Sequence, residues 1–283
     1  MTDGAHWRWR ETAAPVAPGV FLGPSADVAR NSPMLEWLAR HLGAPLVVSR
    51  LSSSDELELA DLSLGAVPLW AQRLLLSARS LRDVRHVRVV RCRGVSSAQL
   101  CAFFERQPAL RSLNVCGCDG LVLPLLRLPD LLVLKLAGCA LSAAAAAGLA
   151  DGCPSLRELW LESIDGAEMA RLGGLRLEQF TLTSCGALRD AALAPLLAAA
   201  GEGGGADHGC APHAAPSLPP SLTHLDLSQC GRLVAPPLAS AALASLSLDE
   251  CTSLTSLDFL GALPALTALS LAYCRCADLG ASA

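Results

Sequence analysis

A nine-residue pattern of apolar and polar positions recurs along this chain of 283 residues. Its first, fourth and sixth positions are apolar, most often leucine, and its ninth is nearly always cysteine. Because side chains alternate between the two faces of a strand, the fourth and sixth positions share one face and their polar neighbours the other. The pattern predicts short strands with one buried face. The copies are Val84–Cys92, Leu110–Cys118, Leu131–Cys139, Leu156–Ile164, Leu177–Cys185, Leu222–Cys230, Leu243–Cys251 and Leu266–Cys274.

The spacing of the copies predicts how they pack. Their ninth positions are 26, 21, 25, 21, 45, 21 and 23 residues apart. One repeat of this length cannot bury its own leucines, so neighbouring repeats stack and share a core. The strands then form a parallel sheet, and the return segments form helices or tight turns on the other side. The long interval contains a low-complexity segment at 201–217, which we predict to be a surface loop.

The full repeat, Leu-x-x-Leu-x-Leu-x-x-Cys-x-x-Leu-x-Asp-x-x-Leu, resembles the cysteine-containing subtype of leucine-rich repeats found in F-box/LRR proteins. Leu177–Leu193 matches it nearly completely, including Asp190, and Gly152–Leu156 matches the Cys-Pro-x-Leu that joins repeats in that family. The resemblance covers about residues 84–283. It implies an α/β leucine-rich repeat solenoid, a horseshoe like ribonuclease inhibitor, with the parallel sheet on its concave face and helices and turns on its convex face.

The N-terminal part departs from the repeat. We expect residues 1–50 to form a helical cap with irregular segments, and residues 51–283 to form eight or nine repeats. Within the cap, Pro33 and Gly43 mark the start and the stop of a helix. Residues 59–67 fit the template with Val67 in the cysteine place, and 69–81 would be the helix of that ninth repeat.

The resemblance implies a function only in part. F-box/LRR proteins dock on a Skp1-like adaptor through an F-box and hold a substrate for ubiquitination, but we recognise no F-box in residues 1–83. The repeats alone predict a non-catalytic scaffold that binds a protein partner on its concave face, without a cofactor. A substrate receptor in an SCF-like ubiquitin ligase, with a Skp1/cullin-type complex as partner, is one alternative. A regulator of a GTPase is another.

The polar positions of the strands are the candidate binding residues. Trp160 stands out, because an aromatic side chain in the middle of a binding face is a typical interface hot spot; the alternative is that it packs under a neighbouring loop or long side chain. The candidate set is Arg85, Arg88, Arg91, Arg111, Asn114, Lys135, Arg157, Trp160, Glu162, Thr181, Asp226 and Asp249.

Charge is unevenly distributed along the chain. Residues 1–141 carry 16 basic and 12 acidic side chains, whereas residues 142–283 carry 6 and 14, which together give the net charge of −4. A solenoid with this distribution would orient a complementary partner along its axis. The net charge argues against nucleic-acid binding, which requires a broad basic surface. We find no phosphate-binding loop, nucleophile motif or carboxylate pair, so we do not expect an enzyme.

Seven cysteines occupy the ninth position of the repeat. We predict that they form a structural column of buried, free thiols, which fits a reducing compartment, the cytoplasm or the nucleus. His208, Cys210 and His213 are zinc-ligand types, but they lie close together in the low-complexity segment and we do not assign a metal site to them. No apolar run is long enough to span a membrane. The column is Cys92, Cys118, Cys139, Cys185, Cys230, Cys251 and Cys274.

Overall fold

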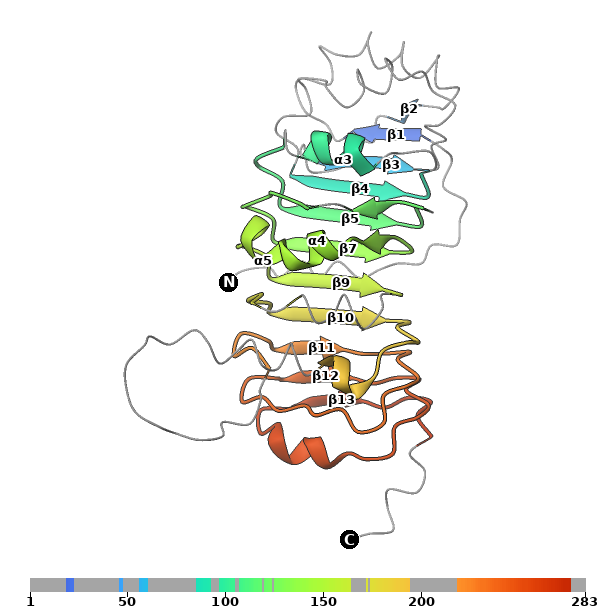
Figure 1. Ribbon diagram of the computed structural model, residues 1–283, viewed down its shortest axis with the longest axis vertical. Helices are drawn as coiled ribbons and strands as arrows, with labels where there is room; N and C mark the ends of the chain where they lie inside the picture. The colour runs from blue at the N-terminus through green and yellow to red at the C-terminus, as the bar shows by residue number, and fades with distance from the viewer. Residues whose placement is uncertain are drawn as a thin grey trace, which may run out of the picture.

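The computed structural model describes residues 19–22, 46–47, 56–60, 85–92, 97–104, 107–118, 120–123, 125–163, 172, 174–193 and 218–275. Within these ranges, eleven strands form one sheet in the order β13-β12-β11-β10-β9-β7-β5-β4-β3-β1-β2 (Figure 1). The strands are β1 (Gly19–Leu22), β2 (Leu46–Val47), β3 (Glu56–Ala60), β4 (His86–Val90), β5 (Ser112–Cys116), β7 (Val133–Ala137), β9 (Glu158–Glu162), β10 (Gln179–Thr183), β11 (His224–Asp226), β12 (Ser245–Ser247) and β13 (Ala268–Ser270).

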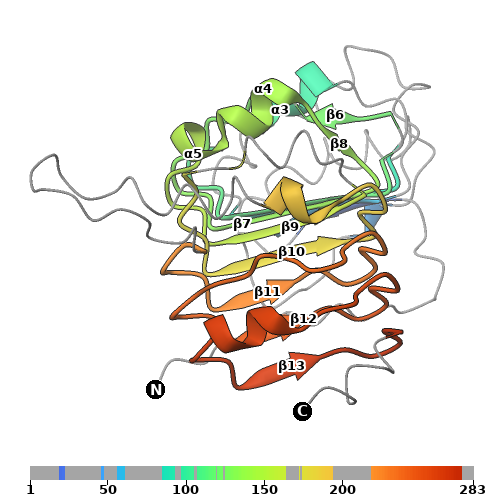
Figure 2. The same ribbon diagram turned by 60° about the horizontal axis from the view of Figure 1, so that its bottom comes forward.

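From β3 to β13, every neighbouring pair of strands in this sheet is parallel. The described return segments lie behind the sheet and include three α-helices, a 3₁₀ helix and a two-stranded sheet (Figure 2). This is the predicted α/β leucine-rich repeat solenoid. The elements are α3 (Ser97–Phe104), β6 (Val122–Leu123), β8 (Ala140–Leu141), α4 (Ala143–Ala147), α5 (Leu149–Gly152) and η4 (Asp258–Ala262). None of the helices in the described part of the chain is long and apolar enough to cross a membrane.

The apolar positions of the pattern form one continuous core. In β5, for example, Leu113 and Val115 are fully buried. They alternate with Ser112, Asn114 and Cys116, which are half-buried. The same alternation recurs in β7 and β9. Each repeat therefore buries its leucines against the next one, as the period of two requires.

The cysteines lie just beyond the strands. Six of the seven are buried and Cys274 is half-buried, and all are free thiols. The Cys118 thiol donates to the carbonyl of Val89 at 3.8 Å, and the Cys251 thiol donates to the carbonyl of Leu227 at 3.2 Å. In both cases the acceptor lies three residues before the cysteine of the preceding repeat, so each of these thiols satisfies a backbone carbonyl of its neighbour.

The residue before each ninth position has a left-handed backbone. The φ angle there lies between 47° and 62° in all eight repeats of the pattern. This conformation closes the turn out of the strand and favours glycine, which has no Cβ to clash. Only two of the eight are glycines, so six side chains accept the strained position. The eight are Arg91, Gly117, Gly138, Ser163, Ser184, Gln229, Glu250 and Tyr273.

The return segments approach one another closely behind the sheet. Ser142 caps α4, because its hydroxyl accepts a hydrogen bond from the Ala145 amide at 3.1 Å. At the end of α5, a Cβ on Gly152 would lie 1.9 Å from the carbonyl oxygen of Leu126. The two backbones therefore touch at this point, which only glycine permits.

The N-terminal end differs from the sequence-based expectation. The first parallel strand is β3, whose Leu57 and Leu59 are in register with Val87 and Val89 of β4. The ninth repeat therefore begins earlier than 59–67, because the alternation of glutamate and leucine over 56–59 suits a half-buried strand better. The sheet also continues into the segment expected to be a cap, since β1 pairs with β3 in antiparallel fashion and β2 pairs with β1. The helices expected at 33–43 and 69–81 lie outside the described residues.

Candidate protein-binding face

The middle positions of the strands form a single row across the open face of the sheet. Register pairs each of these residues with the corresponding residue of the next strand, and Glu58 of β3 is in register with the first of them. The central row is Arg88, Asn114, Lys135, Trp160, Thr181, Asp226, Ser247 and Ser270. The polar positions of distant repeats are thus brought together as the sequence pattern predicts.

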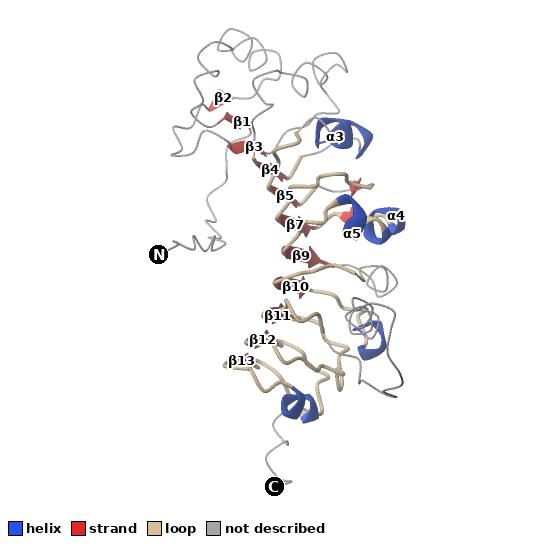
Figure 3. Cartoon of the chain, turned by 90° about the vertical axis from the view of Figure 1, so that its left-hand side faces the viewer, coloured by secondary structure: helices blue, strands red, loops and turns tan. Residues whose placement is uncertain are grey.

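The open face is curved. Figure 3 shows the strands following an arc with β9 at its deepest point, and the described helices all lie on the opposite side. The central row therefore runs along a concave surface that no described helix covers. Trp160 lies on β9, at the middle of this surface.

Trp160 and Lys135 form the centre of the row. The Lys135 ammonium lies 5.0 Å from the centroid of the Trp160 ring and 2.5 Å from a carboxylate oxygen of Glu158. A cation at this distance is attracted to the electron-rich face of the indole. Trp160 is half-buried rather than fully exposed, and the long side chain of Lys135 lies over its ring.

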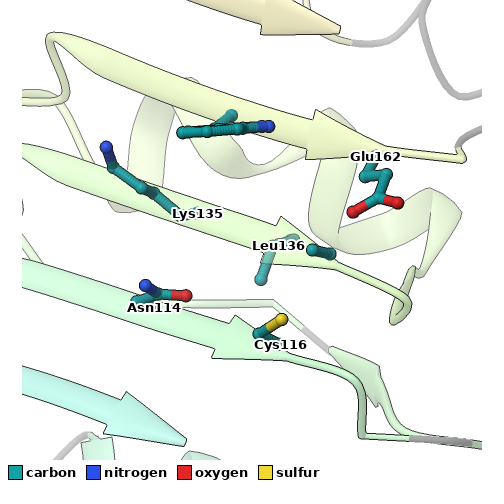
Figure 4. A pocket seen from close by; sticks show the side chains of 7 residues that line it. Asn114, Cys116, Lys135, Leu136 and Glu162 are labelled. Atoms are coloured by element: carbon teal, nitrogen blue, oxygen red, sulfur yellow. The ribbon is translucent and has the colours of Figure 1, made fainter. Parts of the chain in front are cut away.

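A hollow of about 330 Å³ opens beside this pair. Three adjacent strands, β5, β7 and β9, supply its walls, and Figure 4 shows Lys135 and Glu162 at opposite ends of it along the strand direction. Ala137 and Cys116 are small side chains that leave the space open. Its lining residues are Asn114, Cys116, Lys135, Leu136, Ala137, Trp160 and Glu162.

The hollow carries an unneutralised negative charge. Lys135 pairs with Glu158, and no hydrogen bond or ion pair joins the Glu162 carboxylate to another residue of the described ranges. Burial raises the pKa of the Cys116 thiol most, and the charge of Glu162 raises it further. Arg88 and Arg91 act in the opposite direction and lower it. Glu162 is thus the charged group that acts most strongly on Cys116 within the hollow.

The remaining basic candidates lie around the row. Arg85, Arg111 and Arg157 immediately precede β4, β5 and β9 and are exposed at the edge where the strands begin. Arg157 pairs with Glu178 of the next repeat. Arg91, which the sequence places on the face, instead occupies the left-handed turn at the other edge. The basic candidates thus frame the face from both edges.

The acidic candidates at the C-terminal end bond to hydroxyls and backbone amides. The Ser228 hydroxyl donates to Asp226 at 2.5 Å, and the Ser270 hydroxyl donates to Asp249 at 2.5 Å. Asp249 also accepts the Ala272 amide at 2.7 Å. Asp249 therefore links its repeat to the next one, whereas Asp226 bonds to the turn of its own repeat, so both carboxylates have a structural role as well as a charge.

Sequence reasoning missed two features of this face. It did not pair Lys135 with Glu158, and it did not place Cys116 and Ala137 in a hollow. The signal for the hollow was available: both small residues lie two positions beyond the central row, next to Glu162. Among the described residues, no group of His, Cys, Asp and Glu side chains could hold a metal ion; His208, Cys210 and His213 lie outside them.

No protein-family model matches the chain, and no curated protein matches it. Nineteen chains of solved structures are similar to it, and two of them serve as examples. The leucine-rich repeat domain of the type III effector XopL has 16% sequence identity over 89% of this chain and 86% of that chain, with a TM-score of 0.46. A chain of the Rad7–Elc1 complex of yeast has 14% sequence identity over 78% of this chain and 70% of that chain, with a TM-score of 0.39.

Proposed function

We propose that this protein is a non-catalytic scaffold that binds a protein partner on the concave face of its repeats. The observation that carries the proposal is the central row, in which Trp160 and a hollow occupy the deepest strands of a face that no described helix covers. Binding faces concentrate their free energy in a few aromatic and charged residues near the centre, surrounded by polar ones. The concave face has this composition.

Site-specific photo-crosslinking tests the proposal. A photoreactive amino acid replaces Thr181 or Ser247 on the concave face, or Arg127 in an exposed return segment as the matched control. We expect one partner protein to crosslink from both concave positions and not from position 127. When Trp160→Ala is added to either of the two concave-face photoreactive variants, the crosslink should be lost while the circular dichroism spectrum stays unchanged. Crosslinks of equal yield from both sides, or crosslinks unaffected by Trp160→Ala, would contradict the proposal.

A substrate receptor of a ubiquitin ligase is the second candidate. It is supported by the resemblance of Leu177–Leu193 to the repeats of F-box/LRR proteins. The two candidates differ in what co-purifies with the intact chain. A Skp1-like or cullin-like protein among the stoichiometric partners would favour the ligase, and its absence alongside a concave-face crosslink would favour the simple scaffold.

A further inference from the structure

We propose that the hollow in the concave face binds an arginine side chain of the partner protein, with the guanidinium on Glu162 and against Trp160. This inference rests on the protein-binding function proposed above and specifies the chemistry of its central contact. Its starting point is a difference between two glutamates on one strand. Glu158 and Glu162 lie two residues before and two residues after Trp160, on the same face of β9.

Among the described residues, one of these two glutamates has a cationic partner and the other has none. Lys135 has a side chain only 16% exposed, and its ammonium lies 2.5 Å from Glu158. Glu162 has no hydrogen-bonding or ion-pairing partner in the described part of the chain, although it is half-buried and lines the hollow. A half-buried carboxylate without a counterion favours a cation.

The surroundings of Glu162 select arginine among the cationic side chains. The Trp160 indole, over which the Lys135 ammonium already lies, also lines the hollow, where a planar guanidinium could contact it, and a carboxylate accepts a guanidinium in a bidentate pair. The side-chain amide of Asn114, which makes no hydrogen bond within the described ranges, lines the same hollow, and its oxygen offers an acceptor for a further N–H. An ammonium would use these groups less fully because it is compact and not planar.

The size of the hollow suits a single side chain. Its volume of about 330 Å³ lies at the lower end of the range for small-molecule sites, roughly 300–1,000 Å³. The small side chains of Cys116 and Ala137 leave this space free, whereas the residues in the corresponding place on β10 and β4 are Thr183 and Val90. Arginine is also among the residues most often found at interface hot spots, and hot spots tend to pair with one another.

The charge of Glu162 acts inside the hollow that the arginine side chain of the partner would enter. After burial, it is the largest contribution to the raised pKa of Cys116 across the hollow, and it is larger than the opposing contribution of either Arg88 or Arg91 taken singly. The charge of Glu162 therefore acts at Cys116, across the hollow, even with the basic residues of the neighbouring repeat present. A guanidinium that enters the hollow would be attracted to this carboxylate.

Nuclear magnetic resonance tests the inference with small probes. The indole N–H signal of Trp160, assigned with a Trp160→Phe variant among the five tryptophans of the chain, is followed during titration. The probe is N-acetyl-arginine amide, and N-acetyl-citrulline amide is the neutral control of the same shape. We expect a saturable shift with arginine and an affinity at least about fivefold weaker for citrulline, because citrulline cannot form the ion pair.

Two variants separate Glu162 from the general charge of the face. Glu162→Gln should reduce the affinity for the arginine probe by at least about fivefold, whereas Glu178→Gln, which removes an exposed carboxylate on the next repeat, should leave it unchanged. No saturable shift, equal shifts with both probes, or an unchanged affinity in Glu162→Gln would overturn the inference. The citrulline comparison uses the native chain, so it stands even where a variant does not fold.

The outcome is separable from that of the crosslinking experiment. Concave-face crosslinks without an arginine-dependent shift would leave the protein-binding function intact and overturn the arginine inference. An arginine-dependent shift without concave-face crosslinks would overturn the protein-binding function, and with it the assignment of the arginine to a protein partner.

Discussion

The ammonium of Lys135 lies 5.0 Å from the centroid of the Trp160 ring, and the two residues are directly opposite each other on adjacent parallel strands. We predict a coupling free energy of about 0.5–1 kcal/mol between them, the usual size of a cation–π contact near a surface. A double-mutant cycle of Lys135→Met and Trp160→Leu, followed by urea unfolding, measures it. Because the cycle cancels the loss of the Glu158 ion pair, the coupling reports the ring contact alone.

A control cycle tests whether this coupling is specific. Thr181 lies on the other side of Trp160 in the central row and does not adjoin Lys135. The cycle of Lys135→Met and Thr181→Ala should give a coupling below about 0.5 kcal/mol, as expected for residues without a shared contact. Equal couplings in the two cycles would mean that the Lys135 charge acts through the general field of the face rather than through the ring.

The buried thiols predict alkaline instability. Burial raises the pKa of Cys251 to about 12, whereas the pKa of a cysteine in the unfolded chain is about 8.5. Below that value the thiol is neutral in both states; above it the unfolded state loses a proton that the folded state keeps, so stability falls as pH rises from about 8.5 to about 12. In reducing buffer, Cys251→Ala should make this decline shallower by up to about 1.4 kcal/mol per pH unit.

The alkaline prediction is checked by urea unfolding at several pH values between about 8 and 10.5. Leu246→Ala is the control, because Leu246 is buried on the strand of the same repeat and does not titrate. That variant should lower the free energy of unfolding by a similar amount at every pH. A pH slope of Cys251→Ala that equals the slope of the native chain would show that this thiol ionises equally in both states.

The left-handed turns predict which side chains the residue before the ninth position accepts. Ser163 has a φ of 59°, is exposed, and makes a backbone hydrogen bond to Thr183. Ser163→Val should lower the free energy of unfolding by about 1–2 kcal/mol, because a β-branched residue fits this conformation poorly, and Ser163→Gly should be tolerated. Ser253→Val, at an exposed turn residue without positive φ, should change stability by less than about 0.5 kcal/mol.

The sequence predicted those parts of the molecule that follow from alternation and repetition. Leu113 and Val115 are buried because a strand has a period of two, and Asn114, Lys135 and Trp160 share a row because the repeat recurs at equivalent positions. The left-handed turns were missed, since six of the eight residues there are not glycine and their conformation is imposed by closing the repeat.

The sequence also could not predict which of the two glutamates on β9 forms the ion pair with Lys135. Glu158 and Glu162 are equally distant from Trp160 in sequence and lie on the same face, so only the side-chain conformation decides which one is paired. The start of the first repeat was misplaced for a related reason. Residues 56–60 and 59–67 both contain leucines in alternation, and the register with β4 selects the earlier segment.

Asp190, the aspartate of the repeat motif, links return segments that lie far apart in sequence. Its two carboxylate oxygens accept the backbone amides of Val234 at 3.1 Å and Ala235 at 3.0 Å. Asp190→Asn replaces one acceptor with a donor and should lower the free energy of unfolding by about 1–2 kcal/mol. Amide hydrogen exchange at Val234 and Ala235 should accelerate. Asp130→Asn, at an exposed carboxylate, serves as the control, and unchanged exchange at both amides would contradict the clamp.

Gly152 tests how tightly consecutive repeats pack behind the sheet. A Cβ at this position would lie 1.9 Å from the Leu126 carbonyl oxygen, and the Gly152 carbonyl accepts the Leu128 amide at 2.8 Å. Because the clash is with backbone, no side-chain rotation relieves it, and Gly152→Ala should lower the free energy of unfolding by at least about 2 kcal/mol. The effect comes from lack of space alone, since Gly152 is not among the glycines with a positive φ.

Gly261→Ala is the matched control, because a Cβ there meets nothing within 4 Å. It lies in η4 and should change the free energy of unfolding by less than about 0.5 kcal/mol. Both variants are compared by urea unfolding monitored by circular dichroism. If Gly152→Ala is as stable as Gly261→Ala, the segments at 126–128 and 149–152 separate at little cost, and the repeats stack through the strand leucines and the thiols alone. A loss confined to Gly152→Ala shows that backbone contact between the return segments also fixes the stacking, and with it the curvature that holds Trp160 at the centre of the concave face.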